Sequence, residues 1–329
     1  MQAILCSSYG GPEVLQLKEV AKPQPQAKQI LVRVKAASVT AADTMMRRGS
    51  PYIGRLFLGL RKPKHPITGT GFAGIVEAVG SEVGNFAIGD EVFGESIFGQ
   101  GSNAQYLCVS AQGVVAKKPS NLSFEEAAPV CDGALTSLSF LQHVVELKAG
   151  QRILINGAAG SLGTAAVQLA KLFGAHVTAQ CSTANHALVT DLGADEVIDY
   201  KQDNFVTRVQ TNQLPAFDLI YDTVGKLNFG ASKPALSETG IFISPVLSCG
   251  LLGQVLLTTM LGHKKAKFSA TGARPIAELR QMLGQLIPLL ANGTLITVID
   301  RSYPLHKTQL AHQYADKQIK RGNLVLQID

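Results

Sequence analysis

A glycine-rich turn between a predicted strand and a predicted helix is the part of the chain whose residue types point most clearly to chemistry. It spans residues 153–163 and reads Ile-Leu-Ile-Asn-Gly-Ala-Ala-Gly-Ser-Leu-Gly. It fits the pattern G-x-G-x-x-G as Ala158, Gly160 and Gly163, with alanine at the first glycine position. Gly160 would let the backbone approach a pyrophosphate, Gly163 would let the helix pack against the strand, and the helix N-terminus would attract phosphate. The turn therefore predicts a dinucleotide site, and the alternative is a tight turn without a ligand.

The residues after the next strand bear on which dinucleotide is bound. NAD-specific sites normally carry an Asp or Glu about 20 residues beyond the turn, where it accepts from the ribose hydroxyls. This chain has no acidic residue between Glu146 and Asp191, and the second strand ends in Gln-Cys-Ser-Thr at 180–183. Ser182 and Thr183 leave room for a 2′-phosphate and can donate hydrogen bonds to it, so we expect NADPH. Both residues also suit an ordinary helix N-cap.

The elements that position these residues follow two patterns. Residues 1–125 read as short strands separated by glycine turns. A capping box at Ser123–Glu126 then opens a region of alternating strands and helices, which is typical of a parallel sheet covered on both faces. We therefore expect an α/β protein with a β-rich domain over 1–125, completed by 265–329, and a Rossmann domain with a doubly wound parallel sheet over 126–264.

Composition excludes several classes of protein. The chain has 329 residues, 16% of them charged, with a net charge of +6 and five scattered cysteines. These values exclude a disordered chain, a disulfide scaffold and a cysteine-rich metal cluster, and they give no indication of a nucleic-acid partner. The N-terminus has no signal-peptide pattern, so we expect a cytoplasmic protein. We interpret the uncharged stretch 245–262 as a buried helix, too short for an integral membrane segment. The basic stretch 55–65 is either a solvated face or a surface for a membrane or an acidic partner.

Motifs along the whole chain resemble those of the medium-chain dehydrogenase/reductase family, in its zinc-free quinone oxidoreductase branch. They include YGGPEVLQL at 9–17, AASVTAADTMMRRG at 36–49, GTGFAGIVEAVGSEV at 69–83, NGAAGSLGTAAVQLAKLFGA at 156–175 and RGNLVLQ at 321–327. The resemblance implies a GroES-like catalytic domain joined to the Rossmann domain. It also implies a homodimer formed through the Rossmann sheets.

The resemblance also assigns individual residues. Zinc-containing relatives hold a metal with Cys, His and Cys, where this chain has Thr40, Thr70 and about Asp132. Such a set does not suit zinc, so we expect no metal. In the cofactor site, the resemblance places Thr136 at the nicotinamide, Ser182 at the 2′-phosphate, Tyr200 beside the adenosine ribose, and Thr223 and Val224 at the nicotinamide ribose. It also matches Gly160, Ser161, Leu162 and Gly163 to the turn that holds the phosphates. Thr40, Met45 and Asn323 depart from the pattern common in quinone reductases, so the acceptor wall is altered.

We therefore expect an NADPH-dependent oxidoreductase that passes hydride to a quinone or an α,β-unsaturated carbonyl without zinc. These acceptors spread the arriving charge onto oxygen, so a weak donor suffices. Thr40 is the candidate donor and Asp43 the candidate residue that fixes its loop, although Thr40 would also serve as a space filler and Asp43 as a turn cap. The alternatives are a non-catalytic NADPH-binding sensor or scaffold and an enoyl-thioester reductase.

Overall fold

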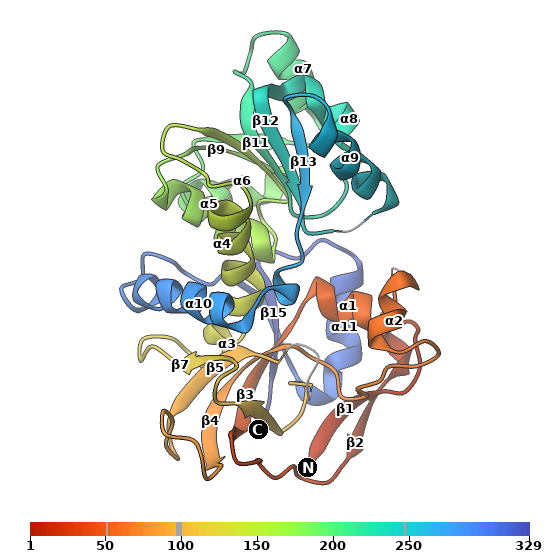
Figure 1. The fold of residues 1–329 in the computed structure, drawn as a ribbon, viewed down its shortest axis with the longest axis vertical. Coiled ribbons are helices and arrows are strands. Elements are labelled where there is room, and N and C mark those ends of the chain that lie inside the picture. The colour runs from red at the N-terminus through yellow and green to blue at the C-terminus, as the bar shows by residue number, and fades with distance from the viewer. Residues whose placement is uncertain (51, 97–100, 247) are drawn as a thin grey trace. The chain divides into compact units, whose positions relative to one another are not determined.

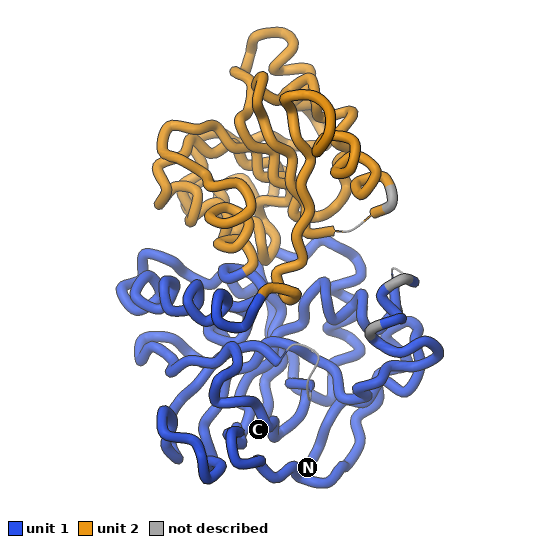
Figure 2. The backbone as a smooth tube through the Cα atoms, viewed as in Figure 1, with its two compact units in different colours: residues 1–135, 275–329 blue, residues 136–274 orange. Residues whose placement is uncertain are grey.

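The computed structural model describes residues 1–50, 52–96, 101–246 and 248–329. Its chain divides into two compact units (Figure 2). Unit 1 comprises Met1–Leu135 and Pro275–Asp329, and unit 2 comprises Thr136–Arg274. Each unit has its own sheets and its own apolar core, so each is described by itself.

Unit 1 is built on a mixed sheet of seven strands. Its order is β14-β15-β3-β4-β5-β7, and β6 also pairs with β3. All pairs in it are antiparallel except β14 with β15. The strands are β3 (Gln29–Val39), β4 (Gly71–Val79), β5 (Glu91–Glu95), β6 (Tyr106–Ser110), β7 (Val114–Lys117), β14 (Ile299–Pro304) and β15 (Asn323–Gln327). A separate antiparallel pair joins β1 (Gln2–Cys6) to β2 (Leu15–Glu19).

The long central strand β3 shows why this sheet forms. Ile30, Val32 and Val34 are fully buried, which is the two-residue period of a strand with one face in the core. The strand is contacted on both edges and continues into helix α1, so its end positions the first residues of that helix. The helices of unit 1 are α1 (Ala41–Arg48), α2 (Arg55–Leu58), α3 (Phe124–Ala127), α10 (Ile276–Ala291) and α11 (Thr308–Asp316).

Unit 2 contains a six-stranded parallel sheet in the order β10-β9-β8-β11-β12-β13. The strands are β8 (Arg152–Asn156), β9 (His176–Cys181), β10 (Glu196–Asp199), β11 (Phe217–Asp222), β12 (Leu236–Ser244) and β13 (Lys265–Phe268). This order is that of a doubly wound dinucleotide-binding fold, and its direction reverses between β8 and β11.

Helices cover both faces of the parallel sheet (Figure 1). In Figure 1, α5 and α6 lie on one side of it, and α7, α8 and α9 on the other. A core cluster joins Phe205 of α7, Phe229 of α8 and Leu251 of α9 to strand residues such as Phe242. The helices of this unit are α4 (Thr136–Leu138), α5 (Ser161–Leu172), α6 (His186–Asp191), α7 (Phe205–Gln210), α8 (Phe229–Ser232) and α9 (Cys249–Met260).

The observed units differ from the predicted domain boundaries of 1–125, 126–264 and 265–329. The capping box at Ser123 is present and opens α3, but this short helix packs on β3 and β4, so it belongs to unit 1. At the other boundary, residues 265–268 form β13, which pairs with β12 and therefore belongs to unit 2. The segment that returns to complete unit 1 begins at Pro275.

The apolar stretch 245–262 forms the predicted helix, α9, but the prediction that this helix is buried is wrong. Residue 247 lies outside the described part of this stretch. Helix α9 touches the sheet through Leu251 and through Thr258, whose Oγ1 accepts from Ala266 N at 3.0 Å. Leu256 and Met260 point to solvent, with exposed fractions of 68% and 78%. Among the described residues, no helix is both long enough and apolar enough to span a membrane.

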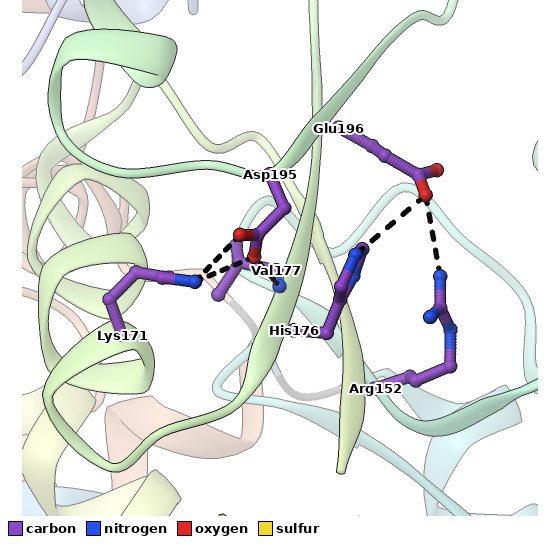
Figure 3. A network of polar contacts seen from close by, with 6 residues as sticks. All are labelled: Arg152, Lys171, His176, Val177, Asp195 and Glu196. Atoms are coloured by element: carbon purple, nitrogen blue, oxygen red, sulfur yellow. Dashed lines mark hydrogen bonds and ion pairs between the residues drawn. The ribbon is translucent and has the colours of Figure 1, made fainter. Parts of the chain in front are cut away.

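A network of polar contacts ties the first three strands of unit 2 together at their beginnings (Figure 3). Asp195 accepts two hydrogen bonds from Lys171 Nζ, at 2.7 and 2.8 Å, and a third from Val177 N at 2.7 Å. Glu196 faces Arg152, with 3.4 Å between Oε1 and Nη2, and lies 3.9 Å from His176 Nε2. Burial raises the pKa of the Asp195 carboxyl, but the bonds from Lys171 and Val177 outweigh it, so the net pKa is lowered.

We predict that Asp195→Asn lowers the free energy of unfolding by about 1–2 kcal/mol at pH 7, because it removes a charge-assisted pair that is only partly screened by solvent. A lowered native pKa means that the carboxylate stabilises the fold above its unfolded pKa and ceases to do so as the pH falls through the native value. The difference between variant and wild type should therefore shrink at about pH 3. Urea unfolding at both pH values measures it.

The control is Asp203→Asn, which weakens an exposed pair 3.5 Å from Arg208 Nε. It should change stability by less than about 0.5 kcal/mol. Equal effects of the two substitutions would show that the Asp195 network does not stabilise unit 2.

Candidate functional site

The loops that follow β8 and β11 meet at the point where the strand order of unit 2 reverses. Parallel strands β8 and β11 pair up to their last residues, with Asn156 opposite Asp222. Thr223 donates from its N–H to Asn156 O at 3.2 Å and from its hydroxyl to the same oxygen at 2.8 Å. Ligands of doubly wound folds bind at the carboxyl ends of the strands at this reversal. Both the glycine turn and residues 223–224 lie there.

The glycine turn is shaped for a close approach of backbone to backbone. At residue 163, a Cβ would lie 2.2 Å from Gly157 O and 2.6 Å from Ala158 Cα, so only glycine fits. Gly157 has a φ of +75°, and a Cβ there would lie 2.3 Å from Val224 Cγ2. Gly160 is the N-cap of α5 and has no side chain with which to cap the helix. These features form a cradle that suits a pyrophosphate at a helix N-terminus.

Asp222 organises the loop beside this cradle, and the sequence reasoning did not single it out. The buried carboxylate accepts from Asn156 Nδ2 at 2.8 Å, from Gly225 N at 3.0 Å and from Leu227 N at 2.8 Å. Burial raises the pKa of Asp222, and these hydrogen bonds oppose the rise. The carboxylate therefore holds residues 223–227 in place, and its position at the end of a buried strand was the available signal.

The end of the second strand carries the residues predicted to contact the 2′-phosphate. Ser182 is half-buried, and its Oγ accepts from Asn185 Nδ2 at 3.3 Å, so its own hydrogen can serve another acceptor. The hydroxyl of Thr183 instead donates to the carboxylate of Asp199, which also accepts from Thr183 N at 3.0 Å. Asp199 lies near Thr183 because β10 pairs with β9, which places Asp199 opposite Cys181. Tyr200, the next residue, is 55% exposed.

Asp199 brings an acidic side chain to this strand edge that the linear sequence did not place there. Hydrogen bonds from Thr183 and Lys201 N lower its pKa, so the group carries its charge at neutral pH. Both of its oxygens already accept hydrogen bonds, Oδ2 from Thr183 and Oδ1 from Lys201 N at 2.8 Å. Of the two hydroxyls, only that of Ser182 is left in a position to donate to a phosphate.

Thr136 stands at the start of α4 and of unit 2, where it is half-buried. The hydroxyl of the next residue, Ser137, donates to Leu162 O at 2.9 Å. This bond links α4 to the first turn of α5. Unit 2 thus brings Thr136 and the glycine turn together, with Thr223 and Val224 at the same strand ends, while Ser182, Thr183 and Tyr200 lie at the edge formed by β9 and β10.

The two candidate catalytic residues, Thr40 and Asp43, form a capping box at the start of α1 in unit 1. Asp43 Oδ2 accepts from Thr40 N and from Thr40 Oγ1, both at 2.8 Å, and Thr40 Oγ1 accepts from Asp43 N at 3.0 Å. Thr40 is 2% exposed. Its one hydroxyl hydrogen is therefore directed to Asp43, which leaves it poorly placed to donate to a substrate oxygen while that carboxyl is ionised.

A cavity of about 430 Å³ lies in unit 1 beside α1. Asp43 lines it, whereas Thr40 is not among the described residues that do. Met46, Leu56 and Ile67 give it apolar walls. This size and composition suit a small organic ligand. The basic stretch 55–65 contributes Lys64 and His65 to the lining, while Arg55 is used structurally, donating from Nε to Gly49 O at 2.9 Å.

The residues at the zinc-ligand positions of related dehydrogenases do not suit zinc. Thr40 is used by the capping box, and Thr70 is a buried hydroxyl. Throughout the described part of the chain, no group of three or more His, Cys, Asp or Glu side chains is arranged to hold a metal ion. Two threonine hydroxyls do not supply the nitrogen and sulfur ligands that zinc prefers.

We predict that Gly163→Ala and Gly160→Ala separate stability from cofactor binding. The methyl group at 163 would overlap Gly157 O, so this variant should lose about 1–3 kcal/mol of stability and also bind dinucleotide poorly. At 160 the added Cβ would meet only Gly157 O at 3.3 Å, and φ is an ordinary −81°. Gly160→Ala should therefore fold with near-normal stability but lose affinity, because its methyl group would cover the turn.

Thermal unfolding and a fluorescence titration with NADPH measure the two effects. Tight NADPH binding by Gly160→Ala would contradict the assignment of this turn to the pyrophosphate.

Two protein-family models match successive parts of the chain. "Alcohol dehydrogenase GroES-like domain" matches residues 26–120, and "Zinc-binding dehydrogenase" matches residues 192–326. Among curated proteins, the quinone oxidoreductase of Sus scrofa is 32% identical over 320 residues, which cover 95% of this chain and 93% of that protein.

Solved structures show the same relationship. The quinone oxidoreductase of Coxiella burnetii superposes with a TM-score of 0.87 at 30% identity, and the superposition covers 100% of this chain and 99% of the Coxiella chain. The quinone oxidoreductase of Escherichia coli, solved as a complex with NADPH, gives 0.85 at 28% identity, with 99% and 100% covered. The predicted fold, a GroES-like domain with a Rossmann domain, is confirmed. The chain belongs to the medium-chain dehydrogenase/reductase superfamily, in its quinone oxidoreductase branch, and is an oxidoreductase.

Proposed function

We propose that this oxidoreductase transfers hydride from NADPH to a quinone or an α,β-unsaturated carbonyl without the help of zinc. The glycine turn at the strand reversal of unit 2 carries the proposal, because residues 157 and 163 are packed too tightly to carry a Cβ and because helix α5 begins there at a glycine, an N-terminus that suits a pyrophosphate. In this proposal unit 2 binds the cofactor through Thr136, Gly160–Gly163, Ser182, Tyr200, Thr223 and Val224.

The class of acceptor follows from the chemistry available in unit 1. Reduction of an isolated ketone develops a full charge on one oxygen, which relatives that bind zinc stabilise with the metal. Here Thr40 and Thr70 stand at those positions, and neither is a strong Lewis acid or a charged donor. A quinone or an enone spreads the charge by conjugation, so hydrogen bonds within an apolar cavity are enough.

The preference for NADPH rests on Ser182. Its hydroxyl hydrogen is available at the end of β9, and the sequence supplies no carboxylate at the position that normally accepts from the ribose of NAD. Thr183 was predicted to share this role, but its hydroxyl serves Asp199. We therefore propose that Ser182 contacts the 2′-phosphate. The role of Thr183 is then to bind the carboxylate of Asp199 and hold it away from that phosphate.

The assembly and location of the protein stay predictions from the sequence and its family. A homodimer formed through the parallel sheets would extend each sheet at β13, whose outer edge has no partner strand among the described residues. Analytical ultracentrifugation tests the dimer, and imaging of a tagged chain tests the cytoplasmic location.

We predict that purified protein oxidises NADPH with a quinone or an enal at least about 100-fold more efficiently than with a simple ketone, since only the first two delocalise the charge. Absorbance at 340 nm, compared as kcat/KM, measures the ratio. The same preparation should hold far less than one zinc per chain, and a chelator should leave turnover unchanged. Binding of NADPH without turnover of any conjugated acceptor would favour the sensor or scaffold, and turnover of enoyl thioesters alone would favour the thioester reductase.

We predict that Ser182→Asp reduces the ratio of kcat/KM for NADPH to that for NADH by at least about tenfold, or about 1.4 kcal/mol, because a carboxylate repels the 2′-phosphate. Ser182→Asn is the matched control, with nearly the same size and no charge. An equal loss in both variants would indicate a steric effect. No change in either would remove Ser182 from the phosphate site.

A further inference from the structure

Reduction of a conjugated carbonyl consumes a proton as well as a hydride. A carboxyl group in unit 1 has a geometry that suits the donor of this proton. We propose that Asp43 is the acid that delivers this proton to an acceptor bound in the cavity beside α1. The inference rests on the proposed function and extends it, because it names the proton donor. It also changes the role first predicted for Asp43, which was only to fix a loop.

The two carboxyl oxygens of Asp43 have different surroundings. Oδ2 is held by Thr40 through two hydrogen bonds of 2.8 Å, which fixes the orientation of the whole group. Oδ1 is buried and has no hydrogen-bond partner. The side chain is 3% exposed, yet the residue lines the cavity. A buried oxygen without a partner is costly, and a proton on Oδ1 gives it a hydrogen to donate when a carbonyl oxygen enters the cavity.

The surroundings of Asp43 favour its protonated form. Burial is the main cause that raises its pKa, to about 7, and Asp132 raises it further, while hydrogen bonds from Thr40 and the charge of Lys320 oppose the rise. Glu95 belongs to the same group, since burial and the charges of Asp132 and Asp43 raise its pKa to about 8. Asp43 and Glu95 therefore both tend to hold protons near neutral pH, while burial lowers the pKa of Lys320, the lysine that opposes the rise at Asp43.

Other polar groups at the cavity are less suitable acids. The thiol of Cys6 donates to Ser8 O at 3.2 Å, and burial raises its pKa above that of an ordinary thiol. Lys64 and His65 are exposed, so they lie where the cavity meets solvent. Arg47 lines the cavity but is bound through Nη2 to both carboxylate oxygens of Asp316, at 3.0 and 2.8 Å. A guanidinium does not give up a proton at neutral pH.

Reduction of a quinone to a hydroquinone takes two electrons and two hydrogen nuclei. The hydride that bound NADPH would supply brings both electrons and one of the nuclei. One carbonyl oxygen of the acceptor takes the proton of Asp43 Oδ1 as the O–H bond of the carboxyl group breaks. The products are the oxidised nicotinamide, a hydroquinone and the Asp43 carboxylate. A proton from water then restores the acid, so one turnover consumes one proton from solution.

The test is the pH profile of kcat for quinone reduction by wild type and by Asp43→Asn. Asparagine can still accept from Thr40 N and Oγ1, so the capping box is retained, but it has no proton to give. Wild type should keep a constant kcat at low pH and lose it as the pH rises past about 7, where the acid ionises. Asp43→Asn should have a kcat about 100-fold lower, without this fall.

Two further variants test the assignment while keeping the acid. Asp132→Asn removes a charge that raises the pKa of Asp43, so the fall in kcat should move to lower pH. Lys320→Met removes a charge that lowers this pKa, so the fall should move to higher pH. Asp90→Asn is the control; it removes a carboxylate that pairs with Lys117 at 2.9 Å, outside the cavity lining, and should leave the profile unchanged.

A measurement without turnover separates this inference from the proposed function. The raised pKa means that native protein holds a proton that the unfolded chain releases, so the stability contributed by Asp43 is lost as the pH rises from about 4 to about 7. Asp43→Asn should reduce that slope in thermal unfolding. An active wild type with an unchanged pH profile in Asp43→Asn would overturn the inference and leave the proposed function standing. Inactivity of wild type toward every conjugated acceptor would overturn both.

Discussion

The contact between residue 163 and the carbonyl of Gly157 is the constraint on which the cofactor half of the molecule depends. Helix α5 can begin where it does only because residue 163 has no Cβ, which would lie 2.2 Å from that oxygen. The same turn needs glycine at 157, where φ is +75° and Val224 lies close by. The helix start is thus packed on the turn, backbone against backbone, and the turn itself packs on the side chains of Thr223 and Val224 in the loop after β11. The N-terminus of a helix that begins at such a turn is the kind of site that a pyrophosphate binds.

Unit 1 shows the opposite arrangement, in which side chains rather than backbone define the site. The start of α1 is closed by Thr40 and Asp43, which use each other's polar atoms. This mutual bonding uses one oxygen of the buried carboxyl group and leaves the other without a hydrogen-bond partner, in a residue that lines the cavity. A helix cap, normally a matter of local stability, here also sets the orientation of an acid.

The sequence is informative about local geometry and poor at contacts between distant segments. The glycine turn could be predicted because its three positions lie within one strand, one turn and one helix. The capping box at Thr40 was predicted only in part, because Asp43 was expected to fix a loop or cap a turn, whereas it caps helix α1, which the sequence analysis did not predict. The role of Asp199 was not, because it depends on β10 lying beside β9 in one register. The exposed face of α9 was missed because a run of apolar residues has the same composition whether it faces a core or solvent.

The two halves of the proposed reaction make different demands on the chain. Hydride transfer needs a fixed place for the cofactor, and in the glycine turn residue 163 cannot carry a Cβ without a clash with Gly157 O. Stabilising the reduced acceptor needs only a source of positive charge, which a metal or a proton can supply. With Thr40 and Thr70 at the ligand positions, a buried carboxyl group that keeps its proton near neutral pH is an alternative source. Such an acid is strong enough for an acceptor whose charge is already delocalised and too weak for an isolated alkoxide, so the acid and the class of acceptor are expected to occur together.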